Sequence, residues 1–273
     1  MRTSNEDSFL IADLTGGSLL DEQRIAQFEV GQRGVLLAVS DGMGGHAAGD
    51  VASALVVESL RRSMTRQPAH GSTDALLEKA ALRANLDVWT AARTVGGKDM
   101  GATLTAVFIH DKTAHIAEVG DSRAYLVRSG TIQQVTRDQS YVQLMIDSGQ
   151  MSPEEAKASQ FSSVILQAMG QNEDVQIALG RLDLRQRDCI ILCSDGLSGL
   201  VSAEEMRAVV LGAGPLNAVC DKLVELAMQR GASDNITVIV AGVSGDLPAL
   251  VAGETISDTL VVVREFAPGP PVA

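Results

Sequence analysis

The chain has 273 residues, of which 45% are hydrophobic and 21% are charged, a composition typical of a globular protein with a sizeable core. Its longest apolar runs, such as 35–39 and 238–241, fall far short of the roughly 20 residues that a membrane-spanning helix needs. The net charge of −12 argues against nucleic-acid or anionic-membrane partners, because like charges repel. The odd number of cysteines, three, and the lack of a basic and apolar leader favour the cytoplasm.

The predicted elements begin with two strands and two helices. Residues 8–12 form a short strand, and 35–40 is a continuous apolar run typical of a buried strand. Apolar residues then recur at helical spacing in 52–60 and again in 77–88, which predicts two amphipathic helices.

A block of strands and turns follows these helices. Ser129-Gly130 has the composition of a hairpin turn between two of the strands. We expect an antiparallel meander made of the segments 103–109, 114–119, 123–127 and 131–135.

The second half of the chain mixes helices and strands. A helix is expected at 139–148, and capping boxes at Ser152 and Ser202 mark two further helix starts. An apolar stripe predicts another helix from about Pro215. The predicted strands in this half are 175–179, 189–194 and 235–243.

Residues 1–243 contain no internal repeat and no linker, so we predict one domain there. Residues 244–273, which end in a proline-rich run, are expected to form a partly flexible tail in which 259–265 adds an edge strand. Helices grouped before and after strand-rich blocks favour an α+β protein with sheet stacked on sheet and helices outside, over a parallel doubly wound sheet.

Acidic residues stand at the ends of several predicted strands. Asp41 and Asp195 each follow a buried strand within a Ser-Asp-Gly sequence. Carboxylates that converge on one site repel unless cations lie between them, and oxygen ligands without a histidine or cysteine cluster favour Mg²⁺ or Mn²⁺ over zinc. The other acids at strand ends are Asp121, Asp234 and the pair Glu6-Asp7.

Each of these features also has a simpler interpretation. An isolated Asp-Gly after a strand is commonly a turn. The glycine-rich segment 42–45 resembles a phosphate-binding loop, but no Gly-Lys-Ser/Thr follows it. His46 alone would be an ordinary surface or capping histidine. The joint occurrence of the acids is therefore what indicates a site.

A set of motifs in one order resembles the metal-dependent protein phosphatases of the type 2C class, especially their compact bacterial form. The resemblance covers residues 2 to about 243 and implies a four-layer α-β-β-α sandwich, in which two mainly antiparallel sheets are flanked by helix pairs. The motifs are RTSNEDS at 2–8, SDGMGGHAAG at 40–49, GATLT at 101–105, GDSRA at 120–124, CSDGL at 193–197 and SDNIT at 233–237.

This resemblance implies a binuclear Mn²⁺ or Mg²⁺ centre at one end of the sandwich. Asp41 would bridge the two cations and the Gly42 carbonyl would bind one of them. Asp121 together with Asp195 resembles a site for a third ion. The remaining implied ligands are Asp195, Asp234 and the acidic pair Glu6-Asp7, in which either acid could be the direct ligand.

The implied activity is hydrolysis of phosphoserine and phosphothreonine on proteins by a hydroxide held at this centre. Arg2 matches the arginine that grips the substrate phosphate, and His46 is the candidate general acid. The resemblance implies a monomeric cytoplasmic enzyme that opposes serine/threonine kinases and acts on phosphorylated proteins, with no nucleic-acid or membrane partner.

Three departures from the family pattern leave alternatives open. Arg2 follows Met1 directly, where the family has a strand; Gln139 stands where a histidine is common; and 158–163 lacks a His-Pro pair. These departures allow a catalytically weak pseudophosphatase or a regulatory binding module with the same fold. A phosphatase for anti-sigma-factor antagonists would share the chemistry and differ only in its partner.

Overall fold

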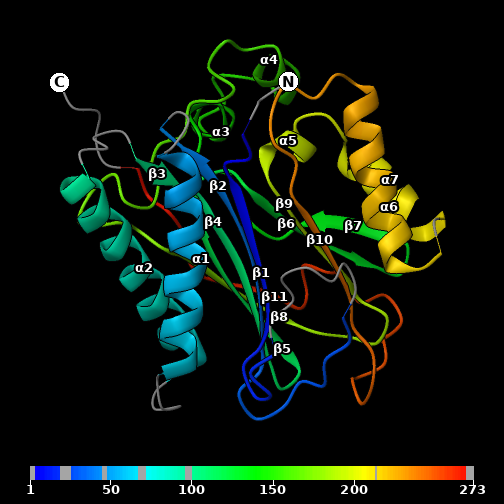
Figure 1. The fold of residues 1–273 in the computed structure, drawn as a ribbon. Helices are drawn as coiled ribbons and strands as arrows, with labels where there is room; N and C mark the ends of the chain where they lie inside the picture. Colours follow the sequence, from blue (N-terminus) through cyan, green and yellow to red (C-terminus); the bar gives the residue numbers. More distant parts are fainter. Residues whose placement is uncertain are drawn as a thin grey trace.

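The structure, a computed structural model, describes residues 4–18, 26–44, 48–66, 72–95, 100–212 and 214–268. Two β-sheets pack face to face, and helices cover the outer face of each sheet (Figure 1). The predicted α+β fold with four layers, α-β-β-α, is therefore confirmed.

The first sheet contains the N-terminal strands and the last strand of the described chain. All of its paired strands are antiparallel. Its order in the described residues is β1 (Asp7–Asp13), β2 (Val35–Met43), β4 (Leu104–His110), β5 (Thr113–Val119), β8 (Ala178–Asp183) and β11 (Leu260–Arg264), and β3 (Gly101–Ala102) pairs with the end of β2.

The second sheet is also antiparallel. The predicted hairpin turn is confirmed, because Ser129 and Gly130 join two of its strands with φ angles of 50° and 78°. Its order in the described residues is β10 (Val238–Gly242), β9 (Cys189–Cys193), β6 (Arg123–Arg128) and β7 (Thr131–Gln134).

The predicted four-strand meander is wrong at its centre. The strands β4 and β5 form a hairpin in the first sheet, whereas β6 and β7 form a hairpin in the second. The chain crosses between the sheets at Gly120. Its φ of 105° is a conformation that favours glycine, and a Cβ added there would lie only 2.7 Å from Cγ2 of Thr103. This crossing places Asp121 at the junction of the two sheets.

The helices lie in three groups (Figure 1). The long helices α1 (Gly49–Arg66) and α2 (Thr73–Val95) cover the first sheet, as the helical spacing predicted. The short helices α3 (Tyr141–Asp147) and α4 (Pro153–Lys157) lie at one end of the sandwich, where Ser152 forms the predicted capping box. The second sheet is covered by α6 (Ala203–Gly212) and α7 (Leu216–Gln229), and α5 (Asp195–Ser198) follows β9 directly.

The apolar run of β2 is explained by burial on both faces of its sheet. Leu36 and Ala38 point toward α1 and α2, whereas Leu37 and Val39 point into the layer between the two sheets. A third apolar cluster fills the space between the second sheet and α6 and α7. Because alternate residues of a strand face opposite sides, a central layer needs this unbroken hydrophobic pattern.

The described part of the C-terminal segment packs against the sandwich. The predicted edge strand at 259–265 is confirmed by β11, which pairs with β8. Ile256 and Thr259 are buried, and the hydroxyl of Thr259 accepts a hydrogen bond of 2.6 Å from the buried guanidinium of Arg128. None of the helices in the described ranges combines the length and apolar character needed to cross a bilayer.

Candidate functional site

Strand pairing in the first sheet brings two predicted metal ligands face to face. Asp7 begins β1 and is the register partner of Asp41 near the end of β2. Residues directly opposite each other in an antiparallel pair have neighbouring side chains. Two carboxylates separated by 34 positions in the sequence therefore meet at one end of this sheet.

Strand pairing in the second sheet brings the other aspartates to the same end. Cys193 of β9 pairs with Arg123 of β6 and with Val238 of β10. Asp121 precedes Arg123 by two residues and Asp195 follows Cys193 by two, so the antiparallel register places them opposite each other. Asp234 lies just before the paired part of β10.

Hydrogen bonds join the ends of the two sheets. The Ser194 hydroxyl donates to Oδ2 of Asp7 at 2.8 Å, which links β9 to β1. Asn235 accepts a hydrogen bond from the Glu6 N–H at 3.0 Å and donates to the Ser4 carbonyl at 3.1 Å. We call the aspartates gathered here the acidic site; they are Asp7, Asp41, Asp121, Asp195 and Asp234.

The electrostatics of the acidic site show how tightly its charges are crowded. Burial, the largest cause, and the charges of Asp7, Asp195 and Asp234 together raise the pKa of Asp41 to about 10. Burial also raises the pKa of Asp121 to about 7, with Asp195 as the next contributor. A bound cation would favour the charged form of each carboxylate that the site now disfavours.

The donor set of the acidic site fits a hard divalent cation. Oδ1 of Asp7 is buried and finds no hydrogen-bond partner within the described part of the chain. As their side chains stand, however, no three or more His, Cys, Asp or Glu residues of the described ranges form a group that could hold a metal ion. The described carboxylates therefore meet at one end of the sandwich without forming a complete coordination shell in this structure.

The glycines after Asp41 and Asp195 are needed for close backbone packing. Neither Asp-Gly pair is the simple turn that the sequence also allowed, because one lies within β2 and the other within α5. A Cβ on Gly42 would overlap the carbonyls of Gly49 and Glu6, and a Cβ on Gly196 would overlap the carbonyl of Asn235. These approaches hold the backbone of each aspartate against a neighbouring segment of the site.

The structure separates the two acids of the Glu6-Asp7 pair. Asp7 belongs to the acidic site, where it lies opposite Asp41 in the strand register and its charge interacts with that of Asp195. The Glu6 carboxylate instead faces the start of α1, where its Oε2 lies 2.9 Å from the position of a Cβ on Gly49. The Glu6 carbonyl accepts hydrogen bonds from the Gly42 N–H at 3.0 Å and the Ser53 hydroxyl at 2.6 Å.

Several positioning residues were not singled out from the sequence. The Thr103 hydroxyl accepts the Asp41 N–H at 2.9 Å and shares a hydrogen bond of 2.8 Å with the hydroxyl of Ser122, beside Asp121. Ser194 and Asn235 connect the sheets, as described above. The only sequence signal for these residues was their place inside the quoted motifs, where small polar side chains stand next to the acids.

Two of the predicted functional residues, Arg2 and His46, lie outside the described residues. Their predicted roles stay predictions. The remaining predicted site residues are all described, and the structure gathers the aspartates while directing Glu6 toward α1.

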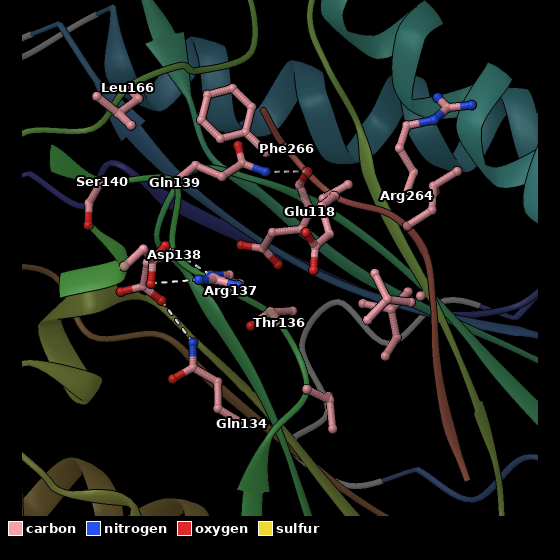
Figure 2. Close-up of a pocket in the computed structure, with 18 of the residues that line it drawn as sticks. Glu118, Gln134, Thr136, Arg137, Asp138, Gln139, Ser140, Leu166, Arg264 and Phe266 are labelled. Atoms are coloured by element: carbon pink, nitrogen blue, oxygen red, sulfur yellow. Dashed lines mark hydrogen bonds and ion pairs between the residues drawn. The ribbon is translucent and has the colours of Figure 1, made fainter. Parts of the chain in front are cut away.

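A separate cavity of about 340 Å³ lies between the inner part of the first sheet, the segment before α3 and the C-terminal segment. Figure 2 shows Gln139, Glu118 and Phe266 around one part of this cavity and Arg264 on another side of it. Glu118 is 2% exposed, and the Thr105 hydroxyl donates to its carboxylate at 3.1 Å. Burial raises the pKa of Glu118 well above its ordinary 4.5, with Asp138 as the next cause.

Replacing Glu118 by glutamine should reduce the pH dependence of stability. The folded protein keeps a proton on Glu118 that the unfolded chain releases above about pH 4.5, so the free energy of unfolding falls as pH rises above that value. The slope from one such group is at most about 1.4 kcal/mol per pH unit. Urea unfolding in EDTA at pH 5 and pH 8 should show a smaller loss for Glu118→Gln than for the unchanged chain.

The matched control for this measurement is Glu204→Gln, since Glu204 is exposed on α6 and pairs with Arg207. It should keep the slope of the unchanged protein. Equal slopes for Glu118→Gln and Glu204→Gln would contradict the prediction.

The fold and the site together define an α-β-β-α sandwich protein with carboxylates gathered where its two sheets meet. A profile of the protein phosphatase 2C family matches residues 18–237, and the chain therefore belongs to that family.

Known relatives agree with this assignment. The serine/threonine protein phosphatase PstP of Mycobacterium tuberculosis is 38% identical over 233 residues, covering 82% of this chain and 44% of PstP. The chain thus spans less than half the length of that relative. The protein phosphatase PhpP of Streptococcus pneumoniae is 32% identical over 211 residues, covering 77% of this chain and 86% of PhpP.

A solved structure shows the same fold with metal present. The catalytic domain of PstP in complex with two manganese ions superposes with a TM-score of 0.74 at 33% identity, covering 90% of this chain and 94% of the PstP domain.

Proposed function

We propose that this chain hydrolyses phosphoserine and phosphothreonine esters on proteins, using Mn²⁺ or Mg²⁺ held by the acidic site. The observation that carries the proposal is the meeting of Asp7, Asp41, Asp195 and Asp234 where the two sheets join, within a protein phosphatase 2C fold. The manganese complex of the related PstP domain supports the choice of metal.

The position of each carboxylate suggests its role. Asp41 interacts with three other aspartates and is the group best placed to bridge two cations. The carbonyl of Gly42, the next residue, would bind one of these cations. Asp7 is favoured over Glu6 as the direct ligand because Asp7 lies in the acidic site. Asp121 beside Asp195 is the proposed site for a third ion. The bound ions would lower the pKa of a water and neutralise phosphate charge.

Two further residues complete the proposed chemistry. Arg2 would bind two phosphate oxygens through the planar fork of its guanidinium, which suits paired oxygen acceptors. His46 would hold the proton that the departing serine or threonine oxygen takes up.

The cellular setting is also part of the proposal. The substrates would be phosphorylated proteins, and the activity would oppose serine/threonine kinases. A reducing cytoplasm fits the free cysteines Cys189, Cys193 and Cys220. The chain would act there as a monomer. The net charge of −12 gives no attraction to nucleic acid.

The direct experiment measures phosphate release from a phosphothreonine peptide with Mn²⁺, with Mg²⁺ and with EDTA. We expect hydrolysis that needs the metal and that returns when Mn²⁺ is restored after chelation. Hydrolysis that survives EDTA would contradict the metal-dependent mechanism. No hydrolysis with any divalent cation, while the folded protein still binds the phosphopeptide, would favour the regulatory binding module instead.

Gly196→Ala should weaken the metal site without touching a ligand. The added Cβ would overlap the Asn235 carbonyl and so displace the segment that carries Asp234. The side chain of Asn235 in this segment also accepts the hydrogen bond from the Glu6 N–H. Groups that orient metal ligands typically contribute 10- to 100-fold in affinity, and we expect a loss of about that size in Mn²⁺ titration calorimetry.

Gly212→Ala is the control for this glycine, because a Cβ at the end of α6 would meet nothing within 4 Å. Its Mn²⁺ affinity should be unchanged and its stability equal or higher by up to about 1 kcal/mol. A Gly196→Ala protein with unchanged Mn²⁺ affinity would contradict the proposed packing role.

A further inference from the structure

The turn that carries Asp121 is held by one buried glutamine. Gln139 is 1% exposed, and its Oε1 accepts the Gly120 N–H at 2.9 Å while its Nε2 donates to the Glu118 carbonyl at 3.1 Å. Its own N–H donates to the Gly120 carbonyl at 2.7 Å. Figure 2 marks the hydrogen bond between Gln139 and Glu118. The side chain and the backbone of Gln139 therefore both hold the crossing between the two sheets.

A second glutamine continues this contact away from the turn. Nε2 of Gln167 donates to Oε1 of Gln139 at 2.8 Å and to the carbonyl of Gln176 at 2.6 Å. Oε1 of Gln167 accepts the N–H of Gln176 at 3.1 Å. The Gln167 amide thus clasps both backbone groups of Gln176 while it touches Gln139.

A third glutamine repeats the clasp on the C-terminal segment. Nε2 of Gln176 donates to the Ala267 carbonyl at 3.1 Å, and its Oε1 accepts the Ala267 N–H at 3.3 Å. Ala267 follows Phe266, which lines the cavity beside Gln139. An unbroken series of amide hydrogen bonds therefore runs from Ala267 in the C-terminal segment to the backbone beside Asp121.

Glutamine suits each position because its amide offers a donor and an acceptor at once. That pair matches one backbone carbonyl and one backbone N–H, from a single residue at Gln167 and Gln176 and from Glu118 and Gly120 at Gln139, which a carboxylate or an ammonium group cannot do. Gln176 is exposed and Gln167 half-buried, so the outer contacts compete with water, whereas Gln139 is fully enclosed. The series is weakest at its outer end, at Ala267, which is where a change in the C-terminal segment would act.

We infer that Gln139, Gln167 and Gln176 form a positioning relay through which docking of the C-terminal segment holds the Gly120-Asp121 turn in place. The relay acts on the site of the proposed phosphatase function and in that respect rests on it. Docking of residues 265–268 keeps Gln176 and Gln167 oriented, and Gln167 keeps the Gln139 amide aligned with Gly120. Release of the segment loosens the turn and weakens cation binding at Asp121.

The same relay reaches the helices at the end of the sandwich. The Leu166 N–H donates to the Gln139 carbonyl at 2.7 Å, and the Tyr141 N–H at the start of α3 donates to the Val164 carbonyl at 2.8 Å. Gln139 therefore joins the turn of Asp121 to the segments on both sides of α3 and α4. Loosening at Gln139 would reach these helices as well as the metal site.

Amide hydrogen exchange of Gly120 in metal-free protein tests the relay directly, since this N–H donates to Gln139. Gln176→Ala removes only exposed side-chain contacts and should speed Gly120 exchange at least threefold. Gln186→Ala is the matched control, because Gln186 also donates from an exposed amide to a backbone carbonyl, that of Gly245. It should leave Gly120 exchange unchanged. Equal exchange rates in the two variants would overturn the relay.

Calorimetric Mn²⁺ titration gives the second readout. Gln176→Ala should weaken Mn²⁺ binding at the proposed third site beside Asp121, taken as the weakest site, at least threefold and leave the other sites unchanged. Gln176→Glu keeps the acceptor for the Ala267 N–H, and its affinity should lie between those of Gln176→Ala and the unchanged chain. An unchanged weakest site alongside faster Gly120 exchange would overturn the link to Asp121. The exchange measurement needs no catalysis, so a chain without phosphatase activity would still confirm or refute the relay, and an active enzyme with unaltered Gly120 exchange would refute the relay alone.

Discussion

Asp41→Asn is expected to lower metal-dependent phosphopeptide hydrolysis by roughly a thousandfold or more, which corresponds to a loss of about 4 kcal/mol of transition-state stabilisation. Asp41 lies opposite Asp7 in the strand register, and its charge also interacts with Asp195 and Asp234. Asparagine keeps the size of the side chain but removes the negative charge that a bridging ligand must supply. Mn²⁺ calorimetry should show fewer bound ions than in the unchanged chain.

The metal-free variant should remain folded, which separates a lost site from a lost fold. Burial and the neighbouring carboxylates raise the pKa of Asp41 to about 10, so the metal-free folded protein must hold a proton that the unfolded chain releases. Asparagine removes this cost, and the thermal unfolding temperature in EDTA should be equal or higher. Asp246→Asn changes the net charge equally on an exposed side chain that pairs with Lys112, and it should keep full activity. An Asp41→Asn protein with more than a tenth of the normal rate and a normal ion count would refute the proposed role.

Arg128→Ala is expected to lower the free energy of unfolding by about 3–5 kcal/mol, because it leaves a buried carboxylate without its partner. The side chain of Arg128 is 2% exposed and that of Asp188 is fully buried, and two hydrogen bonds of 2.8 and 2.6 Å join them. The same guanidinium donates to the Thr259 hydroxyl and to the Asp183 carbonyl. It therefore connects the second sheet to the end of the first and to the C-terminal segment.

Urea unfolding measures this effect, with Arg83→Ala as the control. Arg83 pairs with Asp87 on the surface of α2, and its side chain is 60% exposed, so its loss should cost no more than about 1 kcal/mol. The double variant Arg128→Met with Asp188→Leu should lower the free energy of unfolding by less than the sum of the two single changes. Each single change leaves one buried charge unpaired, whereas the double variant removes both charges. A loss below about 1 kcal/mol for Arg128→Ala would contradict the account of this buried pair.

Local patterns in the sequence were sufficient to predict most elements of the fold. The apolar run of β2 has a simple cause, since this strand faces apolar layers on both sides. The helical spacing in α1 and α2, the capping box at Ser152 and the turn at Ser129 each depend on residues only a few positions apart. Such short-range signals can be read without knowing what lies across the molecule.

The failed meander shows the limit of local signals. Every strand from β4 to β7 was anticipated, yet the change of sheet at Gly120 was not. A glycine between two strands is compatible with a hairpin or with a crossing, and only the packing of the second sheet on the first decides between them. The relay of Gln139, Gln167 and Gln176 was hidden for the same reason, because its members meet only when the C-terminal segment packs.

The sequence by itself determined most strands and helices, the Asp-Gly pairs at strand ends and, through the joint motifs, the family. The strand expected at 175–179 is instead Ala178–Asp183, because its position is set by pairing with β5. Only the tertiary structure decided that Asp7 lies opposite Asp41 while the Glu6 carboxylate lies beside Gly49, that Gly42 and Gly196 serve close packing, and that Asp121 lies where the chain changes sheets. The reason is physical. Which side chains meet depends on strand register and on contacts between segments far apart in the chain, whereas the type of an element depends on its own neighbours.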